Sequence, residues 1–235
     1  YVYGLQAYAS SARLGTGGRS ALGFTNNTVN DSYGYVIKWQ GTASAAAAAQ
    51  LMKKGIKLRY AEASFETKGQ SFNAGSIIIL KKKKKKQGGK LWNTVADICN
   101  ANKVTMYPVK SGMVDKGYDF GSAYVHPMKA PRVTLLTGPG ISSYGAGEIW
   151  NFFDNELKYE ITLVNAEDFG NLKWGDIDVL IMPDGRYKFL ADKDDAKKLE
   201  EWIRNGGRVV ALESAVAQLS KQDWSNVKSK NNAEE

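Results

Sequence analysis

Short apolar runs alternate with amphipathic stretches along the second half of the chain. Runs rich in Val, Ile and Leu, typical of buried strands, occupy residues 133–137, 159–164, 178–185 and 208–212. Between them, Ile149, Phe152 and Phe153 share one helical face, and residues 193–205 form an amphipathic helix with Gly206 as its stop. Alternation of this kind predicts a parallel sheet with helices on both faces.

The first half shows the same alternation less clearly. We expect strands at residues 33–39, 56–61, 71–80 and 104–109, an Ala-rich helix over 42–54, and a second helix carrying Leu91, Val95 and Cys99 on one face. This order favours a mostly parallel sheet covered by helices. Residues 1–32 have no clean period and are expected to be irregular.

Charge separates the two halves. Residues 1–130 hold 19 Lys and Arg against 6 Asp and Glu, a net +13, and residues 131–235 hold 13 against 18, a net −5, which together give the +8 of the whole chain. The sequence therefore predicts two α/β domains, a smaller one over residues 1–129 and a second over 130–235. The opposite signs let the halves attract each other or a larger parent protein.

Several kinds of function are disfavoured by composition. The single Cys99 rules out an internal disulfide, and one Cys with one His, His126, is too few for a typical zinc site. Cys99 lies on an apolar helix face, so we interpret it as a core residue. The lysine run 81–86 has no interleaved aromatic residues and is interpreted as a solvated loop, so we expect no nucleic-acid partner. No apolar stretch is long enough to span a membrane.

The candidate functional residues lie where the strands of the second half end. Sites in open parallel sheets form beyond the carboxyl ends of strands, which here are the loops at 138–147, 165–170, 184–188 and 213–215. Gly138 and Gly140 could cradle an anion at a helix start, although Glu148 opposes this. Asp184, Glu148 and Glu213 could form a carboxylate cluster that holds a cation or shares a proton.

Four segments of the second half carry a family resemblance: residues 133–137, the loop into 145–150, the strand 179–185 and the strand and turn 206–215. They resemble the class I glutamine amidotransferase-like superfamily, and more closely the flavodoxin-like domain that follows the catalytic domain in bacterial zinc carboxypeptidases. Residues 34–37, 51–58, 65–79 and 119–122 resemble the linker domain of the same proteins.

The resemblance implies a site without its chemistry. Aligning the strand before the turn places Glu213 where active amidotransferases have a cysteine nucleophile, and no histidine follows it in this sequence. Ser214 is next to that position, backbone donors near Asp184 and Gly185 would outline an oxyanion-like pocket, and Glu148 resembles an acidic residue that approaches the turn. No catalytic residue or metal ligand is assigned, and no cofactor is expected.

The expected function is therefore a non-catalytic accessory region, a pseudoenzyme module of a zinc carboxypeptidase-like hydrolase. Its partner would be a peptidase domain N-terminal to it in the same protein, and the resemblance implies a periplasmic or secreted setting. Two alternatives stay open: a module that binds a small molecule or anion through the loop at 138–147, and a hydrolase that uses Ser214 or Glu213.

Overall fold

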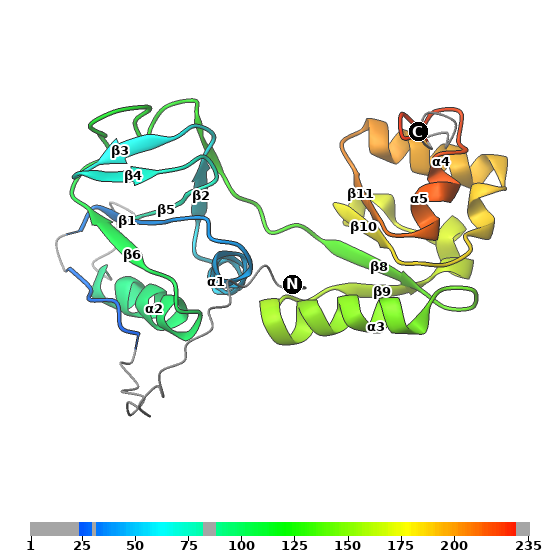
Figure 1. The fold of residues 1–235 in the computed structure, drawn as a ribbon, viewed down its shortest axis with the longest axis horizontal. Helices are drawn as coiled ribbons and strands as arrows, with labels where there is room; N and C mark the ends of the chain where they lie inside the picture. Colours follow the sequence, from blue (N-terminus) through cyan, green and yellow to red (C-terminus); the bar gives the residue numbers. More distant parts are fainter. Residues whose placement is uncertain (1–23, 30–31, 82–87, 229–235) are drawn as a thin grey trace, which may run out of the picture.

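Two separate β-sheets with their own helices form the body of the protein (Figure 1). The computed structural model describes residues 24–29, 32–81 and 88–228. Most of the stretch expected to be irregular, residues 1–32, and most of the lysine run, residues 82–86, lie outside these described residues. Within them, no helix is long and apolar enough to cross a membrane.

The first sheet has five strands in the order β6-β1-β5-β2-β7. Its strands are β1 (Gly34–Ile37), β2 (Leu58–Ala61), β5 (Ile77–Leu80), β6 (Met106–Val109) and β7 (Val125–Pro127), and a separate hairpin joins β3 (Phe65–Thr67) to β4 (Gln70–Phe72). Every neighbouring pair is antiparallel. The expectation of a mostly parallel first sheet is therefore wrong.

The reason for this error lies in the segment expected to be one strand over residues 71–80. A turn at Gly75, with φ +86°, divides it into β4 and β5, and the Ser76 amide donates to the Asn73 carbonyl at 3.1 Å. The β3-β4 hairpin reverses the chain, so β5 enters between β1 and β2 in the opposite direction. The period of apolar residues predicts that a strand is buried, but it does not predict which strands lie next to it.

Helices cover one face of this sheet and aromatic side chains cover the other. Helix α1 (Thr42–Lys53) and helix α2 (Gly88–Ala101) pack Leu51 and Trp92 against alternate residues of the strands. The opposite face holds Phe120 and the hairpin residues Phe65 and Phe72, whose stacked rings are 5.0 Å apart. Both layers are apolar cores, and burial between them stabilises the short strands.

The second sheet is parallel throughout, as expected. Its order is β11-β10-β8-β9, with β8 (Val133–Thr137), β9 (Thr162–Asn165), β10 (Val179–Met182) and β11 (Arg208–Ala211). Strand β8 has the predicted bounds. Strand β9 begins three residues later than expected, because Tyr159 turns into the core and donates its hydroxyl to the Pro131 carbonyl at 2.5 Å.

Helices lie on both faces of the parallel sheet. Helix α3 (Ser143–Asn151) continues into the π-helix η1 (Phe152–Leu157) and packs on the face of Leu135 and Ile181. Helix α4 (Lys193–Arg204) and helix α5 (Ser214–Leu219) pack on the opposite face with Leu180 and Met182. Short 3₁₀ turns complete the connections: η2 (Ala166–Asn171), η3 (Trp174–Asp176) and η4 (Lys188–Leu190).

Helix α1, which packs on the first sheet, contacts η1, which packs on the second (Figure 1). Lys53 on α1 forms an ion pair of 2.5 Å with Glu160, just after η1, and both side chains are more than half exposed. Exposed pairs of this kind contribute at most about 1 kcal/mol. The domain boundary at 129/130 thus stays a prediction, consistent with the strand-free segment between β7 and β8.

Candidate functional site

The turn between β11 and α5 places Glu213 in a backbone conformation that L-amino acids rarely adopt. Its φ is +48° and its ψ is −120°, and the residue is exposed. Sharp strand-to-helix turns of this type raise the nucleophile above the sheet in α/β enzymes. The strain costs about 1–3 kcal/mol, so the surrounding structure must impose it. The predicted turn is present, and it carries a glutamate.

Ser214, the next residue, is held by Asp184 and Gly185. Its hydroxyl makes a short hydrogen bond with the Asp184 carboxylate and lies 2.9 Å from the Gly185 carbonyl oxygen. The single hydroxyl proton therefore has two possible acceptors. The Gly185 amide donates back to the same hydroxyl oxygen at 3.0 Å. The hydrogen bond from the Ser214 hydroxyl, followed by those from the Ser214 and Gly185 amides, keeps the pKa of the Asp184 carboxyl below its ordinary value.

The backbone donors that could form an oxyanion hole are already used. In related turns, the amide of the residue after the nucleophile stabilises the oxyanion. Here the Ser214 amide donates to the Asp184 carboxylate at 3.3 Å, and the Gly185 amide donates to the Ser214 hydroxyl. Both amides expected to outline an oxyanion-like pocket thus already donate to groups of the protein itself.

Two residues that the sequence did not single out complete this network. Gln218 donates to the Gly185 carbonyl at 2.6 Å and accepts from the Tyr187 amide at 2.9 Å. The buried Tyr187 donates its hydroxyl to the Pro183 carbonyl at 2.7 Å, and burial, with the nearby charge of Asp184, raises its pKa. Gln218 lies one helical turn after Ser214, so the sequence spacing alone could have indicated that the two side chains are neighbours.

Glu148 and Glu213 do not join the Asp184 network. Both are exposed, and neither side chain has a hydrogen bond or ion pair among the described residues. No group of three His, Cys, Asp or Glu side chains that could hold a metal ion occurs in the part of the chain that the structure describes. The carboxylates therefore do not converge as a cation site would require.

His126 and Cys99 lie in the first half of the chain, His126 on strand β7 and Cys99 on helix α2. His126 on β7 approaches Glu62 at 2.7 Å and packs on Tyr60, so it does not face the Ser214 turn. Cys99 is completely buried in the core of α1 and α2, and burial raises its thiol pKa to about 12. The interpretation of Cys99 as a core residue is confirmed.

A crevice of about 400 Å³ lies at the carboxyl ends of β8, β9 and β10. Three of the four loops expected to build a site contribute to it, through Pro139, Glu167 and Arg186, whereas the Glu213 turn does not line it. Lys188 adds a second cation, and Glu167 is joined by two more carboxylates, Asp192 and Asp195. This excess of carboxylates disfavours an anion as the ligand.

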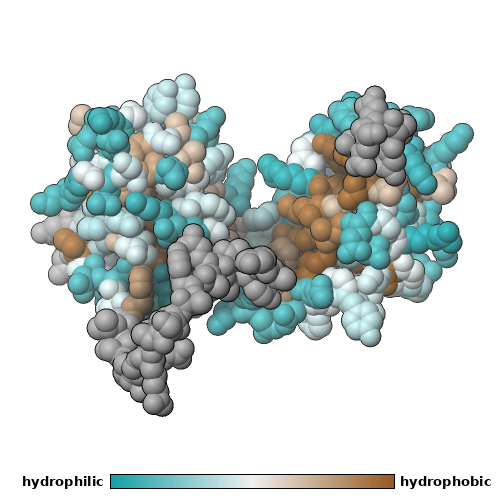
Figure 2. Space-filling view, viewed as in Figure 1, coloured by the Kyte–Doolittle hydropathy of each residue, from teal (hydrophilic) through white to brown (hydrophobic). Residues whose placement is uncertain are grey.

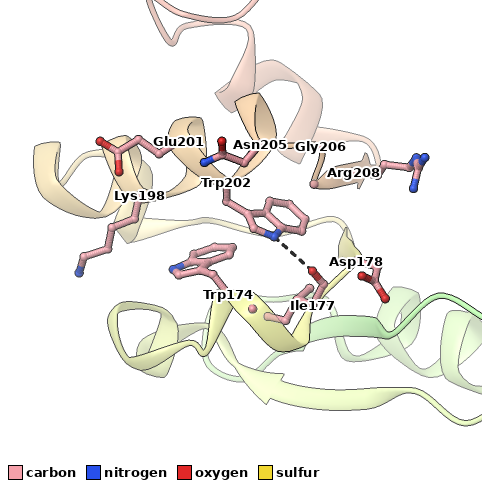
Figure 3. Close-up of a pocket in the computed structure, with 11 residues that line it drawn as sticks. Trp174, Ile177, Asp178, Lys198, Glu201, Trp202, Asn205, Gly206 and Arg208 are labelled. Atoms are coloured by element: carbon pink, nitrogen blue, oxygen red, sulfur yellow. Dashed lines mark hydrogen bonds between the residues drawn. The ribbon is translucent and has the colours of Figure 1, made fainter.

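A larger cavity of about 480 Å³ opens at the opposite, amino end of the strands (Figure 3). Trp174 and Trp202 face each other there, with ring centroids 5.2 Å apart, and the Trp202 indole donates to the Ile177 carbonyl at 3.2 Å. Asp178 at its rim is bound by Arg132, which lowers the pKa of the Asp178 carboxyl to about 2. The bond from Trp202 to Ile177 thus joins α4 to the residue that follows η3, whereas the buried Trp174 indole N–H has no hydrogen-bond partner among the described residues.

Comparisons with protein-family models, with curated proteins and with solved structures find no match to this chain. The fold and site by themselves define a mixed α/β protein with a parallel four-stranded sheet and a strained Glu213-Ser214 turn.

Proposed function

We propose that this chain is a non-catalytic accessory region of a zinc carboxypeptidase-like protein. In this proposal, residues 130–235 form a flavodoxin-like, amidotransferase-like domain, and residues 1–129 form the linker domain that precedes it. The strand order β11-β10-β8-β9 and the strained turn at Glu213 support the resemblance from which the proposal comes.

The proposed non-catalytic role rests on one observation: the polar groups at the turn are already hydrogen-bonded to one another. A glutamate occupies the nucleophile position, the Ser214 hydroxyl is bonded to Asp184 and Gly185, and both candidate oxyanion donors are consumed. Asp184 cannot replace a histidine as general base, because its lowered pKa makes it a weak one. The site therefore joins the loop after β10 to α5, which is a structural role.

Turnover measurements test the absence of catalysis. The protein is incubated with a panel of amide and ester substrates, next to Ser214→Ala and Glu213→Gln. We expect the same rate for all three proteins, indistinguishable from background hydrolysis. A substrate that only the unsubstituted protein hydrolyses would establish the alternative, a hydrolase that uses Ser214 or Glu213.

The proposed parent protein requires a separate experiment. An antibody raised against this chain captures the native polypeptide, and mass spectrometry reads its peptides. We expect peptides with a His-x-x-Glu zinc-binding pair in the same covalent chain. A native polypeptide that lacks them contradicts the peptidase assignment and leaves the non-catalytic role standing.

The crevice at Arg186 favours one alternative function, a module that binds a small molecule. It has both charge signs at the carboxyl ends of three parallel strands, where ligands bind in such sheets. A thermal-shift screen of small metabolites tests this function, with Arg186→Ala as the binding-deficient control. An unchanged melting temperature across the screen would count against it.

A further inference from the structure

One face of the parallel sheet is left partly bare. Along β11, Val209 and Ala211 point into the core of α4 and α5, and Val210, which pairs with Ile181, lies on the α3 face. Val210 is 46% exposed and the following Leu212 is 39% exposed. Figure 2 shows hydrophobic surface gathered over β10 and β11. Parallel sheets are normally covered on both faces, so this apolar surface indicates an interaction site.

Among the strands that the structure describes, β11 also has an edge with no neighbouring strand. Strand β11 ends the order of the sheet, and it bonds to β10 through the amides of Arg208 and Leu212, which donate to Asp178 and Met182 at 3.2 and 3.0 Å. Because amides alternate in direction along a strand, those of Val209 and Ala211 point away from β10. Within the described residues, no hydrogen bond is found for either of these amides. An unpaired edge of this kind is a template for another strand.

We propose that β11 pairs with β11 of a second copy of this chain. The two strands run antiparallel about a two-fold axis at Val210, and the two four-stranded sheets become one continuous sheet of eight strands.

The outward amides fix the register of this pairing. Two residues that lie opposite each other in antiparallel strands exchange two hydrogen bonds only if the amide and carbonyl groups of both point toward the partner strand. In β11 these are the residues whose amides point away from β10. With the axis at Val210, Val209 lies opposite Ala211 of the second copy and Ala211 opposite Val209. All four outward-pointing residues are then satisfied, and the two Val210 side chains meet at a non-hydrogen-bonded pair.

Charge and hydrophobicity agree with this register. Arg208, at the start of β11, comes opposite Leu212 of the second copy, next to its Glu213. The two-fold axis repeats this Arg-Glu proximity at both ends of the pair, and Val210 and Leu212 of both copies form one apolar strip between them. A shift by one residue would place outward amides against inward ones and lose these bonds.

The other edge of the sheet is less suited to the same pairing. Leu163 on β9 is also 46% exposed, but Ile161 and Tyr159 before it pack with α3. Glu160, two residues before β9, is bound to Lys53 of α1, so part of the approach to this edge is occupied. Leu163 therefore provides a control with the same exposed fraction as Val210.

Oxidative cross-linking tests the axis directly. Residues in a non-hydrogen-bonded antiparallel pair have Cα atoms about 4.5 Å apart, which is within disulfide range. We expect Val210→Cys to form a covalent dimer of the whole chain under mild oxidation and Leu163→Cys to stay monomeric. The native Cys99 does not interfere, since it is completely buried. Equal cross-linking of both variants, or of neither, would overturn the proposal.

Sedimentation across micromolar concentrations tests the interface without a cross-link. We expect a dimer whose dissociation constant rises about tenfold or more with Val210→Lys, since an edge lysine blocks strand pairing, while Leu163→Lys has no effect. Arg208→Glu should weaken the dimer, and the exchange Arg208→Glu with Glu213→Arg should restore it. Circular dichroism confirms that each variant is folded. A monomer at every concentration refutes the second copy as the occupant of this edge.

Discussion

The hydroxyl of Ser214 donates to the carboxylate of Asp184, and the amide of the same serine donates to that carboxylate as well. One residue begins α5 and the other follows β10, so this pair fastens two segments that are 30 residues apart in the sequence. A serine beside a strained turn suggests a nucleophile. Its hydrogen-bond partners support the structural role proposed for it.

Ser214→Ala should therefore lower the free energy of unfolding. Loss of the hydroxyl leaves the Gly185 amide without its acceptor and removes one bond from Asp184, at a cost of about 1–2 kcal/mol. Urea denaturation measures this change. Ser220→Ala is the control, because within the described residues the Ser220 hydroxyl bonds only to the nearby Ala217 carbonyl, and its loss should cost less. Equal stability of the two variants would contradict the structural role.

Glu213→Gly should raise the free energy of unfolding by about 1 kcal/mol. Glycine adopts a φ of +48° without steric cost, and this gain exceeds the greater backbone entropy that glycine loses on folding. Thermal denaturation provides the measurement. Glu148→Gly, in the ordinary helix α3, should lower stability by about 1 kcal/mol. Destabilisation by both substitutions would mean that Glu213 makes interactions that outweigh its strain.

Asp178 should make the free energy of unfolding fall at acidic pH. Hydrogen bonds from Arg132 lower its pKa from 3.8 to about 2, so the folded state holds the ionised form more strongly than the unfolded state does. Its contribution is complete above pH 3.8 and is lost as the pH falls toward about 2.

Asp178→Asn should remove that part of the pH dependence and lower stability at neutral pH. Urea titrations between neutral pH and about pH 2 follow both effects. Asp97→Asn is the control, because Asp97 is exposed and has no ion-pair partner in the part of the chain that the structure describes. The same slope of stability with pH in Asp178→Asn and in the unsubstituted protein would refute this assignment.

Gly207→Ala should destabilise the parallel sheet by about 1–3 kcal/mol. A Cβ at this position would lie 2.2 Å from the Trp202 ring, which is fixed by its hydrogen bond to the Ile177 carbonyl. The ring would have to shift and open the packing of α4 on β10. Gly175→Ala serves as the control because a Cβ there meets no atom within 4 Å. Similar melting temperatures for the two variants would show that Trp202 can move freely.

The candidate site was only partly predictable. Glu213, Ser214 and Asp184 could be named from the turn and from the strand ends, because parallel strands bring their carboxyl ends to one edge. The roles of Gln218 and Tyr187 could not, since they depend on which way side chains turn after the helix has packed. Glu148 was named with them, but its side chain is exposed and has no hydrogen bond or ion pair in the part of the chain that the structure describes.

The sequence by itself determined where most strands and helices lie and, in the second half, that the strands are parallel. It also predicted a buried strand over residues 208–212, which is wrong for β11, because no helix that the structure describes covers Val210 and it is 46% exposed. Strand β8, helix α4 and the turn at Gly206 follow from local periodicity and helix-ending signals, and helices between strands leave parallel pairing as the regular solution. Tertiary structure decided the antiparallel order of the first sheet and the bonding of Ser214. Both depend on contacts between residues that are distant along the chain, and a local pattern of apolar and polar residues does not encode such contacts.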